Sequence, residues 1–521
     1  MSFKLTYSTM FNPPEEMHTR FEAALATVRG GLGQRHGLFV DGRDVLTEGW
    51  LAKRCPADTR VLLGEFAAGT ASDTELAIAA ARAAAPAWRR MPMPERLAIL
   101  RRVAALVEER VYELAAAVAL EVGKNRMEAL GEVQEVADFF TGYCDDFERH
   151  GGYDNVLPDD PLADWKSHNR SVMRPYGVWG VITPYNFPFA LAGGPVAAAL
   201  VTGNTVVLKG SSDTPWSGRL LAECLRDAGI PQGVFNYLSG PSVVGATLVG
   251  HPDVDGITFT GSYDIGMEIL RKGAARRFPR PVIAEMGGKN ACIVTAAADL
   301  ERAASGIVRS AFGMGGQKCS ALSRLYVDRS VADALLARVQ AQMAAIRIGD
   351  PCQRDNWLGP VVNERAWRYY ASCAERLAAD GGRILAGGAR LTDGDFAHGY
   401  YVQPALAELP PGHALWQEEM FLPILTIART RSNDEAMALA NGSEFGLTAG
   451  FYGSVEEMAW FHDNIEAGVT YANRPQGATT GAWPGYQPFG GWKGSGSTGK
   501  AIASFYYLPL YLREQSRTVV E

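Results

Sequence analysis

One cysteine of the chain lies three residues after a glycine pair, in the segment Gly315-Gly316-Gln317-Lys318-Cys319-Ser320. A glycine-rich turn allows a substrate or cofactor to approach the sulfur closely. If a helix begins nearby, its free N–H groups and positive dipole end lower the pKa of the thiol, and Lys318 adds a cation. The segment fits a reactive thiolate, and it fits a buried, inert cysteine equally well.

Two other segments carry groups that could assist a thiol. Glu285 ends an apolar run and precedes Gly287-Gly288, so it is either a helix-capping carboxylate or a general base. Asn186 lies between two prolines in Thr183-Pro184-Tyr185-Asn186-Phe187-Pro188, which stiffen its backbone. Its amide either satisfies a buried turn or donates to a developing oxyanion.

The segment Phe259-Thr260-Gly261-Ser262, with Gly266 after it, follows an apolar run and resembles a pyrophosphate cradle at a helix N-terminus. The alternative is a serine-capped helix after a glycine turn. The segment Gly494–Gly499 also matches GxGxxG. It follows a loop rich in proline and tryptophan and no βαβ unit comes after it, so we reject it as the dinucleotide site.

The elements that must position these groups alternate between strands and helices. Residues 178–183, 205–209, 234–240 and 256–261 are predicted strands, and 72–88, 93–148 and 217–229 are predicted helices. A second βα pattern begins near Pro281 and runs to about 470, with strands over 291–296, 323–328 and 422–429 and a helix over 330–346. This rhythm predicts two α/β lobes with parallel sheets. Residues 149–172, a possible hairpin, and the strand-like 504–512 predict a small projecting element.

Bulk properties exclude several classes of protein. A chain of 521 residues is too long for a single hydrophobic core, so we expect two or more lobes. The net charge of −7 makes nucleic acid a poor candidate partner. The charge-free stretch between Arg174 and Lys209 could span a bilayer, but prolines and glycines break it, so we expect a buried unit and no membrane span.

The seven cysteines are scattered and form no CxxC, which argues against disulfides and a metal site. With no apolar signal segment near Met1, they indicate a reducing, cytoplasmic location.

Seven segments, in this order along the chain, give a resemblance to the aldehyde dehydrogenase superfamily. They are TPYNFPF (183–189), GNTVVLKG (203–210), FTGS with IG (259–266), EMGGKN (285–290), GQKCS (316–320), EEMF with P (418–423) and PFGGWKGSG (488–496). The separation of 34 positions from Glu285 to Cys319 also matches the family.

The resemblance implies an NAD(P)-dependent enzyme that oxidises an aldehyde to a carboxylate. Cys319 would form a thiohemiacetal and then a thioester, Asn186 would hold the oxyanion, and Glu285 would activate water. The implied fold has two Rossmann-like lobes and an oligomerisation β element. The implied domains are an NAD(P)-binding domain (1–148 and 173–283), a catalytic domain (284–485) and an oligomerisation element (149–172 and 486–521) that builds a homodimer or larger homo-oligomer.

The resemblance also implies a set of cofactor-binding residues, in which Lys209 binds the adenine ribose and Glu419 with Phe421 the nicotinamide ribose. The set comprises Thr183, Pro184, Tyr185, Lys209, Ser212, Gly245, Thr260, Gly261, Ser262, Gly266, Gly287, Glu419 and Phe421. Many NAD-using members have a glutamate where this chain has Ser212. A serine carries no charge that would repel a 2′-phosphate, and it cannot bind both ribose hydroxyls as a glutamate does. NADP is therefore expected to be at least accepted, alongside NAD. If the Asp213 side chain points inward, its charge could restore discrimination against the 2′-phosphate.

Within the superfamily the chain is most similar to 1-pyrroline-5-carboxylate dehydrogenases, which oxidise L-glutamate γ-semialdehyde to glutamate. The similarity lies in YSTMFNPPEE, LFVDG, EVGKNRMEA, GQKCSALSR and the loop around Thr480. It implies that Ser320, Gly481 and Ala482 anchor the α-carboxylate and that Phe187 contacts the substrate.

Three departures keep a bulkier or aromatic aldehyde open as the substrate: a segment 475–479 about three residues longer than usual, Trp483-Pro484 in place of a small aliphatic pair, and Leu422 where glycine is common. Other readings are a CoA-acylating dehydrogenase, which generally lacks a base at Glu285, a thiol hydrolase, which needs a histidine partner, and a catalytically silent relative.

Overall fold

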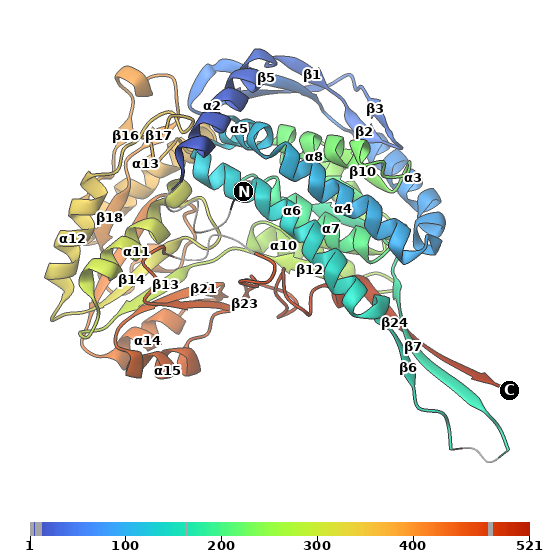
Figure 1. Cartoon of the computed structure of the whole chain (residues 1–521). Helices are drawn as coiled ribbons and strands as arrows, with labels where there is room; N and C mark the ends of the chain where they lie inside the picture. Colours follow the sequence, from blue (N-terminus) through green and yellow to red (C-terminus); the bar gives the residue numbers. More distant parts are fainter. Residues whose placement is uncertain (1–4, 6–12, 162–163, 478–482) are drawn as a thin grey trace.

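The computed structural model describes residues 5, 13–161, 164–477 and 483–521. Two seven-stranded sheets form the cores of two lobes, and a three-stranded sheet projects from the body together with the C-terminus (Figure 1). This is the α/β architecture predicted from the alternation of strands and helices. Among these described residues, no helix is both long and apolar enough to cross a membrane.

The first sheet has five parallel strands and two antiparallel ones at one edge. Its order is β12 (Val282–Glu285), β11 (Gly256–Thr260), β8 (Val178–Ile182), β9 (Thr205–Lys209), β10 (Phe235–Leu238), β2 (Leu38–Val40) and β3 (Arg43–Val45). Helices α7 (Ala190–Val201), α8 (Pro215–Asp227), α9 (Ser242–Gly250) and α10 (Tyr263–Ala274) follow its strands. Almost every residue of α7 is buried, which explains the charge-free stretch.

The N-terminal helices pack beside this sheet (Figure 1). They are α2 (Glu15–Gly30), α3 (Ala71–Arg90), α4 (Met93–Glu109), α5 (Val111–Val122) and α6 (Arg126–Arg149). The helical pattern predicted over 93–148 is therefore three helices. Gly123, with φ of 88°, ends α5 in the left-handed region, and the Asn125 side chain caps α6. A small sheet of β1 (Gln34–His36), β5 (Asp58–Ala67) and β4 (Trp50–Cys55) lies next to them.

The second sheet is parallel except at one edge. Its order is β15 (Arg383–Ala386), β18 (Ala405–Glu408), β19 (Ile424–Thr430), β14 (Leu322–Asp328), β13 (Asn290–Val294), β21 (Thr448–Tyr452) and β22 (Val469–Ala472). Helices α11 (Leu300–Phe312), α12 (Ala332–Ala344), α13 (Glu364–Ala378), α14 (Asn433–Asn441) and α15 (Val455–Asn464) surround it. The predicted start of this pattern near Pro281 is wrong, because β12 pairs with β11 and so belongs to the first sheet.

The projecting sheet consists of β24 (Leu512–Val520), β7 (Ser167–Pro175) and β6 (Asp154–Leu157), all antiparallel (Figure 1). The prediction of a strand over 504–512 is wrong, since the strand begins at Leu512. Pro509 cannot donate to a ladder, and Leu508 and Tyr511 are buried in the core of the first lobe.

The remaining elements are short. They are β16 (Arg390–Leu391), β17 (Tyr401–Val402), β20 (Phe445–Gly446), β23 (Trp492–Lys493) and the 3₁₀ turns η1 (Gly151–Tyr153), η2 (Gly313–Gly316), η3 (Gly394–Phe396), η4 (Ala414–Trp416) and η5 (Leu508–Tyr511).

Candidate active site

The predicted site residues follow strand ends at one edge of the first sheet. Lys209 ends β9, Thr260 ends β11 and Glu285 ends β12, while Thr183 follows β8. The parallel registers of these four strands place their carboxyl ends side by side. Ligands of open parallel sheets bind outside this edge, so the topology assembles residues that are far apart in the sequence.

Cys319 and Glu285 face each other. The Sγ–H group of Cys319 donates a hydrogen bond to Oε1 of Glu285 over 3.9 Å. Cys319 lies in the turn between η2 and β14, and Asn290 holds that turn by donating to the main-chain oxygens of Cys319 (2.6 Å) and Ala321 (2.8 Å). The Oδ1 atom of Asn290 accepts from the Thr448 N–H, so the turn is fixed to the second sheet.

The exposure of the cysteines favours one of the two interpretations of Cys319. All seven cysteines lie in the described part of the chain and none forms a disulfide; six are buried, and Cys319 is partly exposed. A thiol that a substrate can reach fits a reactive group, whereas the other six fit packing.

Burial sets the protonation of both groups. It raises the pKa of Glu285 to about 8 and raises the pKa of Cys319 well above its usual range, with the carboxylates of Glu285 and Glu419 adding to the effect on the thiol. No helix begins at Cys319, and Lys318 forms an ion pair with Glu128 at 2.8 Å, so the activation considered from the sequence is not observed. The thiol needs a base, and the Glu285 carboxylate is within reach.

Asn186 is buried between β8 and α7, with 2% of its surface exposed. Its Oδ1 atom has no hydrogen-bond partner among the described residues. Its main-chain oxygen accepts a 2.7 Å hydrogen bond from Nζ of Lys124. The next residue, Phe187, lines the same cavity as Cys319 and Glu285.

Glu419 contacts the glycine pair that follows β12. Its Oε1 atom accepts from the Gly288 N–H at 2.8 Å, and a Cβ atom at Gly287 would lie 2.1 Å from Oε2. Burial raises the pKa of Glu419 to about 7. Phe421 has a left-handed backbone (φ of 56°), and its ring meets that of Tyr185 edge-on at 5.9 Å. These residues join the two lobes beside the cysteine.

Lys209 and its neighbours form the other end of the same edge. Burial lowers the pKa of Lys209, and the charge of Asp213 acts in the opposite direction. The Asp213 carboxylate accepts a 2.9 Å hydrogen bond from Asn363, which caps α13 in the second lobe. The Ser212 hydroxyl donates to the main-chain oxygen of Gly240 at 2.6 Å. Asp213 therefore points inward, between the lobes.

Two helix N-termini follow β10 and β11. Ser262 precedes α10, but its hydroxyl makes no capping hydrogen bond, so the serine-cap reading is wrong. A Cβ atom at Gly245, near the start of α9, would meet nothing within 4 Å, whereas one at Gly266 would lie 2.5 Å from Sδ of Met286. Ser262 and Gly245 leave room for a ligand, and Gly266 serves packing.

Comparison with known proteins identifies the family of this chain. The sequence profile of the aldehyde dehydrogenase family matches residues 45–515. The 1-pyrroline-5-carboxylate dehydrogenase of Geobacillus thermodenitrificans is 38% identical over 510 residues, which cover 96% of each chain. The chain belongs to the aldehyde dehydrogenase family.

Further relatives agree with this assignment. The 1-pyrroline-5-carboxylate dehydrogenase 1 of Halalkalibacterium halodurans is 37% identical over 513 residues, again 96% of each chain. A crystal structure of 1-pyrroline-5-carboxylate dehydrogenase from Thermus with bound NAD matches all of both chains, with a TM-score of 0.92 and 33% identity. This aldehyde dehydrogenase is an NAD(P)-dependent oxidoreductase, as the resemblance implied.

The cavity at Cys319 of this aldehyde dehydrogenase is lined by Ser320, by Phe187 and by residues of helix α6. Glu135 and Phe139 of α6 are one helical turn apart and also line it, together with Ala190, Leu191, Phe489 and Ile502. Sequence reasoning missed Glu135. Its spacing from Phe139 could have placed both on one helix face, but not which cavity that face lines.

The substrate-loop predictions fall partly outside the structure. Gly481 and Ala482 lie outside the described residues. Trp483 is 4% exposed, and Pro484 packs so closely on α6 that a Cβ atom at Gly142 would lie 2.9 Å from it. The side chain of Leu422, the third departure, is buried in the core of the second lobe.

The Gly494–Gly499 segment braces the site from outside. The Ser495 hydroxyl donates to the main-chain oxygen of Gly287 at 2.7 Å, and the Met286 N–H donates to the main-chain oxygen of Ser495. The Ser497 N–H donates to the main-chain oxygen of Ala284, and the Ser497 hydroxyl accepts from the Ala284 N–H at 2.8 Å. These contacts support the strand end that carries Glu285.

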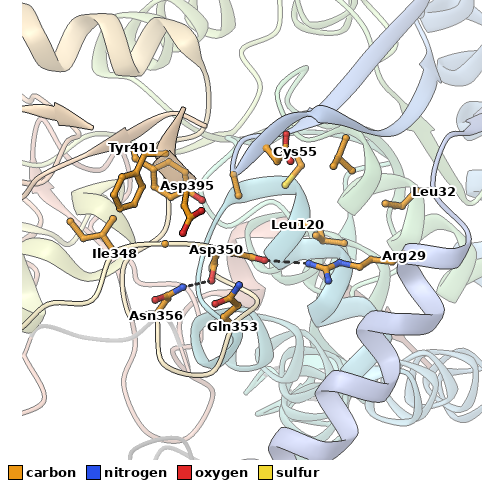
Figure 2. A pocket seen from close by; sticks show the side chains of 15 residues that line it. Arg29, Leu32, Cys55, Leu120, Ile348, Asp350, Gln353, Asn356, Asp395 and Tyr401 are labelled. Atoms are coloured by element: carbon orange, nitrogen blue, oxygen red, sulfur yellow. Dashed lines mark hydrogen bonds and ion pairs between the residues drawn. The ribbon is translucent and has the colours of Figure 1, made fainter. Parts of the chain in front are cut away.

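A larger cavity of about 650 Å³ lies between α2, the β4–β5 hairpin and residues 348–356 (Figure 2). Arg29 and Asp350 form an ion pair within it at 3.3 Å, and Asn356 donates to the main-chain oxygen of Asp350 (Figure 2). None of the predicted site residues lines it. Within the described ranges, no group of three His, Cys, Asp or Glu side chains could hold a metal ion.

Proposed function

We propose that this aldehyde dehydrogenase oxidises L-glutamate γ-semialdehyde to L-glutamate. The relatives named 1-pyrroline-5-carboxylate dehydrogenase support this substrate. The observation that carries the proposal is a single cavity lined by a reachable thiol, a carboxyl group in contact with it and a second carboxyl group, Cys319, Glu285 and Glu135.

The first chemical step is addition of Cys319 to the aldehyde carbon. The Glu285 carboxylate takes the thiol proton as the S–C bond forms, because burial keeps the thiol neutral until a base acts. The aldehyde oxygen becomes an oxyanion, which the Asn186 amide and the Cys319 N–H stabilise. Removal of one such donor typically raises the barrier by about 2.7–4 kcal/mol.

Loss of a hydride then converts the thiohemiacetal into a thioester on Cys319. Bound NAD(P)⁺ supplies the acceptor for this hydride. Glu285 releases the thiol proton to solvent and then takes a proton from water, which attacks the thioester carbonyl. The C–S bond breaks, the carboxylate leaves, and the sulfur regains a proton from Glu285 as the thiol. A pKa of about 8 suits this role, because the carboxyl group can both gain and lose a proton near neutral pH.

The residues at the strand ends fit an NAD(P) cofactor. Glu419 and Phe421 would hold the nicotinamide ribose and Lys209 the adenine ribose. The pyrophosphate would lie by Ser262, whose hydroxyl makes no capping hydrogen bond, and by Gly245. A Cβ atom at Gly245 would meet nothing within 4 Å. The site would be completed by Thr183, Pro184, Tyr185, Thr260, Gly261 and Gly287, with Gly266 supporting it through its close packing on Met286.

We propose that both NAD⁺ and NADP⁺ are accepted. Ser212 carries no charge against a 2′-phosphate, and its hydroxyl is engaged with Gly240. The inward carboxylate of Asp213 opposes that phosphate, so NADP⁺ should be used less well than NAD⁺.

The substrate carries an α-carboxylate and an α-ammonium group. Ser320, together with Gly481 and Ala482, would bind the carboxylate, and Phe187 would contact the carbon chain. Glu135, which lines the same cavity, would attract the ammonium group. An aldehyde without the ammonium group would lose this last contact.

We also propose that the projecting sheet joins subunits into a homodimer or larger homo-oligomer. Its two outer strands, β6 and β24, leave edges to pair, and Val156, Trp165 and Val519 are 74%, 63% and 56% exposed. The oligomerisation element would then comprise residues 149–172 and 486–521. The NAD(P)-binding domain would comprise 1–148 and 173–283, and the catalytic domain would comprise 284–485. The cytoplasmic location stays a prediction from the cysteines.

The substrate proposal is tested by comparing kcat/KM for L-glutamate γ-semialdehyde, succinate semialdehyde and benzaldehyde. We expect the first to be preferred, and we expect Glu135→Gln to reduce that preference over succinate semialdehyde. A preference for benzaldehyde would instead support an aromatic substrate shaped by Trp483. Formation of an acyl-CoA when CoA is added would favour the acylating class.

A further inference from the structure

A fully buried ion pair holds the turn that carries Asn186. The side chains of Lys124, between α5 and α6, and of Glu132, on α6, are both 0% exposed and contact each other. The Lys124 ammonium donates to the main-chain oxygen of Asn186 at 2.7 Å. Glu132 Oε1 accepts from the N–H groups of Phe189 (2.8 Å) and Ala190 (3.2 Å), at the start of α7.

The two members of the pair bind opposite ends of this turn. Lys124 binds a carbonyl oxygen at one end of the turn and Glu132 binds two N–H groups at the other. The ammonium also lies 4.0 Å from the centre of the Phe187 ring. Buried ion pairs contribute little to net stability, because desolvation offsets their attraction. Directional bonds to three backbone groups are therefore the specific effect of this pair.

The carboxamide of Asn186 depends on this backbone support. Its Oδ1 atom has no partner within the described part of the chain, so no hydrogen bond from protein fixes that end of the amide. We propose that Lys124 and Glu132 are positioning residues that aim the Asn186 amide at the oxyanion formed on Cys319, an inference that rests on the proposed function. Neither side chain lines the cavity at Cys319, and both act through residues 186–190.

The kinetic test is a double-mutant cycle. Lys124→Met should lower kcat, since a misplacement of about 1 Å can cost about 10²-fold, while the KM values for aldehyde and cofactor change little. In the Asn186→Ala background the same substitution should cost less than about threefold, because the group that it positions is gone. Glu132→Gln should cost less than Lys124→Met, since glutamine keeps an acceptor oxygen.

Glu121→Gln is the matched control. Glu121 is also 0% exposed and accepts from the N–H groups of Trp216 and Ser217 at the start of α8, a helix that does not carry Asn186. Its effect on kcat should combine additively with that of Asn186→Ala. Additive losses for Lys124→Met and Glu132→Gln as well would overturn the inference, because both would then be merely structural.

A crystal structure of Lys124→Met gives a readout that does not depend on turnover. We expect the fold to be retained and the Asn186 carboxamide to move by about 1 Å. A carboxamide that stays in place would refute the positioning role. If the wild-type enzyme oxidised no aldehyde, the proposed function would fail, while this structural comparison would still decide whether the pair aims the amide.

Discussion

Glu285→Gln should make the enzyme more stable while it removes activity. Burial raises the pKa of Glu285 from 4.5 to about 8, so the folded protein holds this proton over a pH range in which the unfolded chain has released it. Between these pH values the unfolded state binds fewer protons, and stability falls as pH rises. The neutral amide of glutamine does not ionise, so it avoids the free-energy cost of burying a charged carboxylate.

The magnitude follows from the two pKa values. Each unit between them corresponds to about 1.4 kcal/mol, and the cost builds up from pH 4.5 to pH 8. It is about 1 kcal/mol at pH 5 and about 3 kcal/mol at pH 7. The stability advantage of Glu285→Gln over the wild type should therefore grow by about 2–3 kcal/mol between these pH values.

Urea unfolding of both proteins at pH 5 and pH 7 measures this difference. Glu418→Gln is the control of opposite sign, because hydrogen bonds from Arg376 lower the pKa of Glu418 to about 2. Its ionised form is favoured by folding, so that substitution should destabilise the enzyme at pH 7. An advantage of Glu285→Gln that is the same at both pH values, or a loss of stability at pH 7, would refute the reasoning.

Three further predictions concern catalysis and the cofactor. The kcat/KM of the wild type should rise with pH through about pH 8 as Glu285 ionises, and a flat profile from pH 6 to pH 9 would contradict its role as the base. Ser212→Glu should shift kcat/KM towards NAD⁺ by about tenfold or more, since a second carboxylate repels the 2′-phosphate; an unchanged ratio removes Ser212 from the cofactor site. Gly287→Ala should raise the KM for the cofactor with little change in the KM for aldehyde, because its Cβ displaces Glu419, and unchanged cofactor KM would exclude that contact.

The sequence predicted the strand ends at the site well. The short apolar runs before Thr183, Lys209 and Gly261 are the parallel strands β8, β9 and β11, as expected from buried strands with glycine or proline after them. The family resemblance located Cys319 and Glu285, and the structure places them 3.9 Å apart. Neither residue could be distinguished from an inert core group on its local sequence alone.

Features that depend on tertiary contacts could not be predicted. Glu132 lies in a helix whose charges look solvated, and its spacing from Lys124 does not reveal that both are buried. Asp213 meets Asn363 across the lobes, 150 residues later in the chain. The run 504–512 has the composition of a strand, but burial of Tyr511 and the missing N–H of Pro509 override that propensity.

Intact-mass measurement of Glu285→Gln mixed with L-glutamate γ-semialdehyde and NAD⁺ tests the covalent mechanism most directly. Glu285→Gln should slow the attack of the thiol and should also remove the group that activates water, so the thioester that forms over a long incubation should accumulate. Digestion should map the added acyl group to Cys319. Cys319→Ser should show neither the adduct nor NADH. NADH formed with no acyl adduct in Glu285→Gln, or an adduct on another cysteine, would contradict the assignment of the nucleophile and the base.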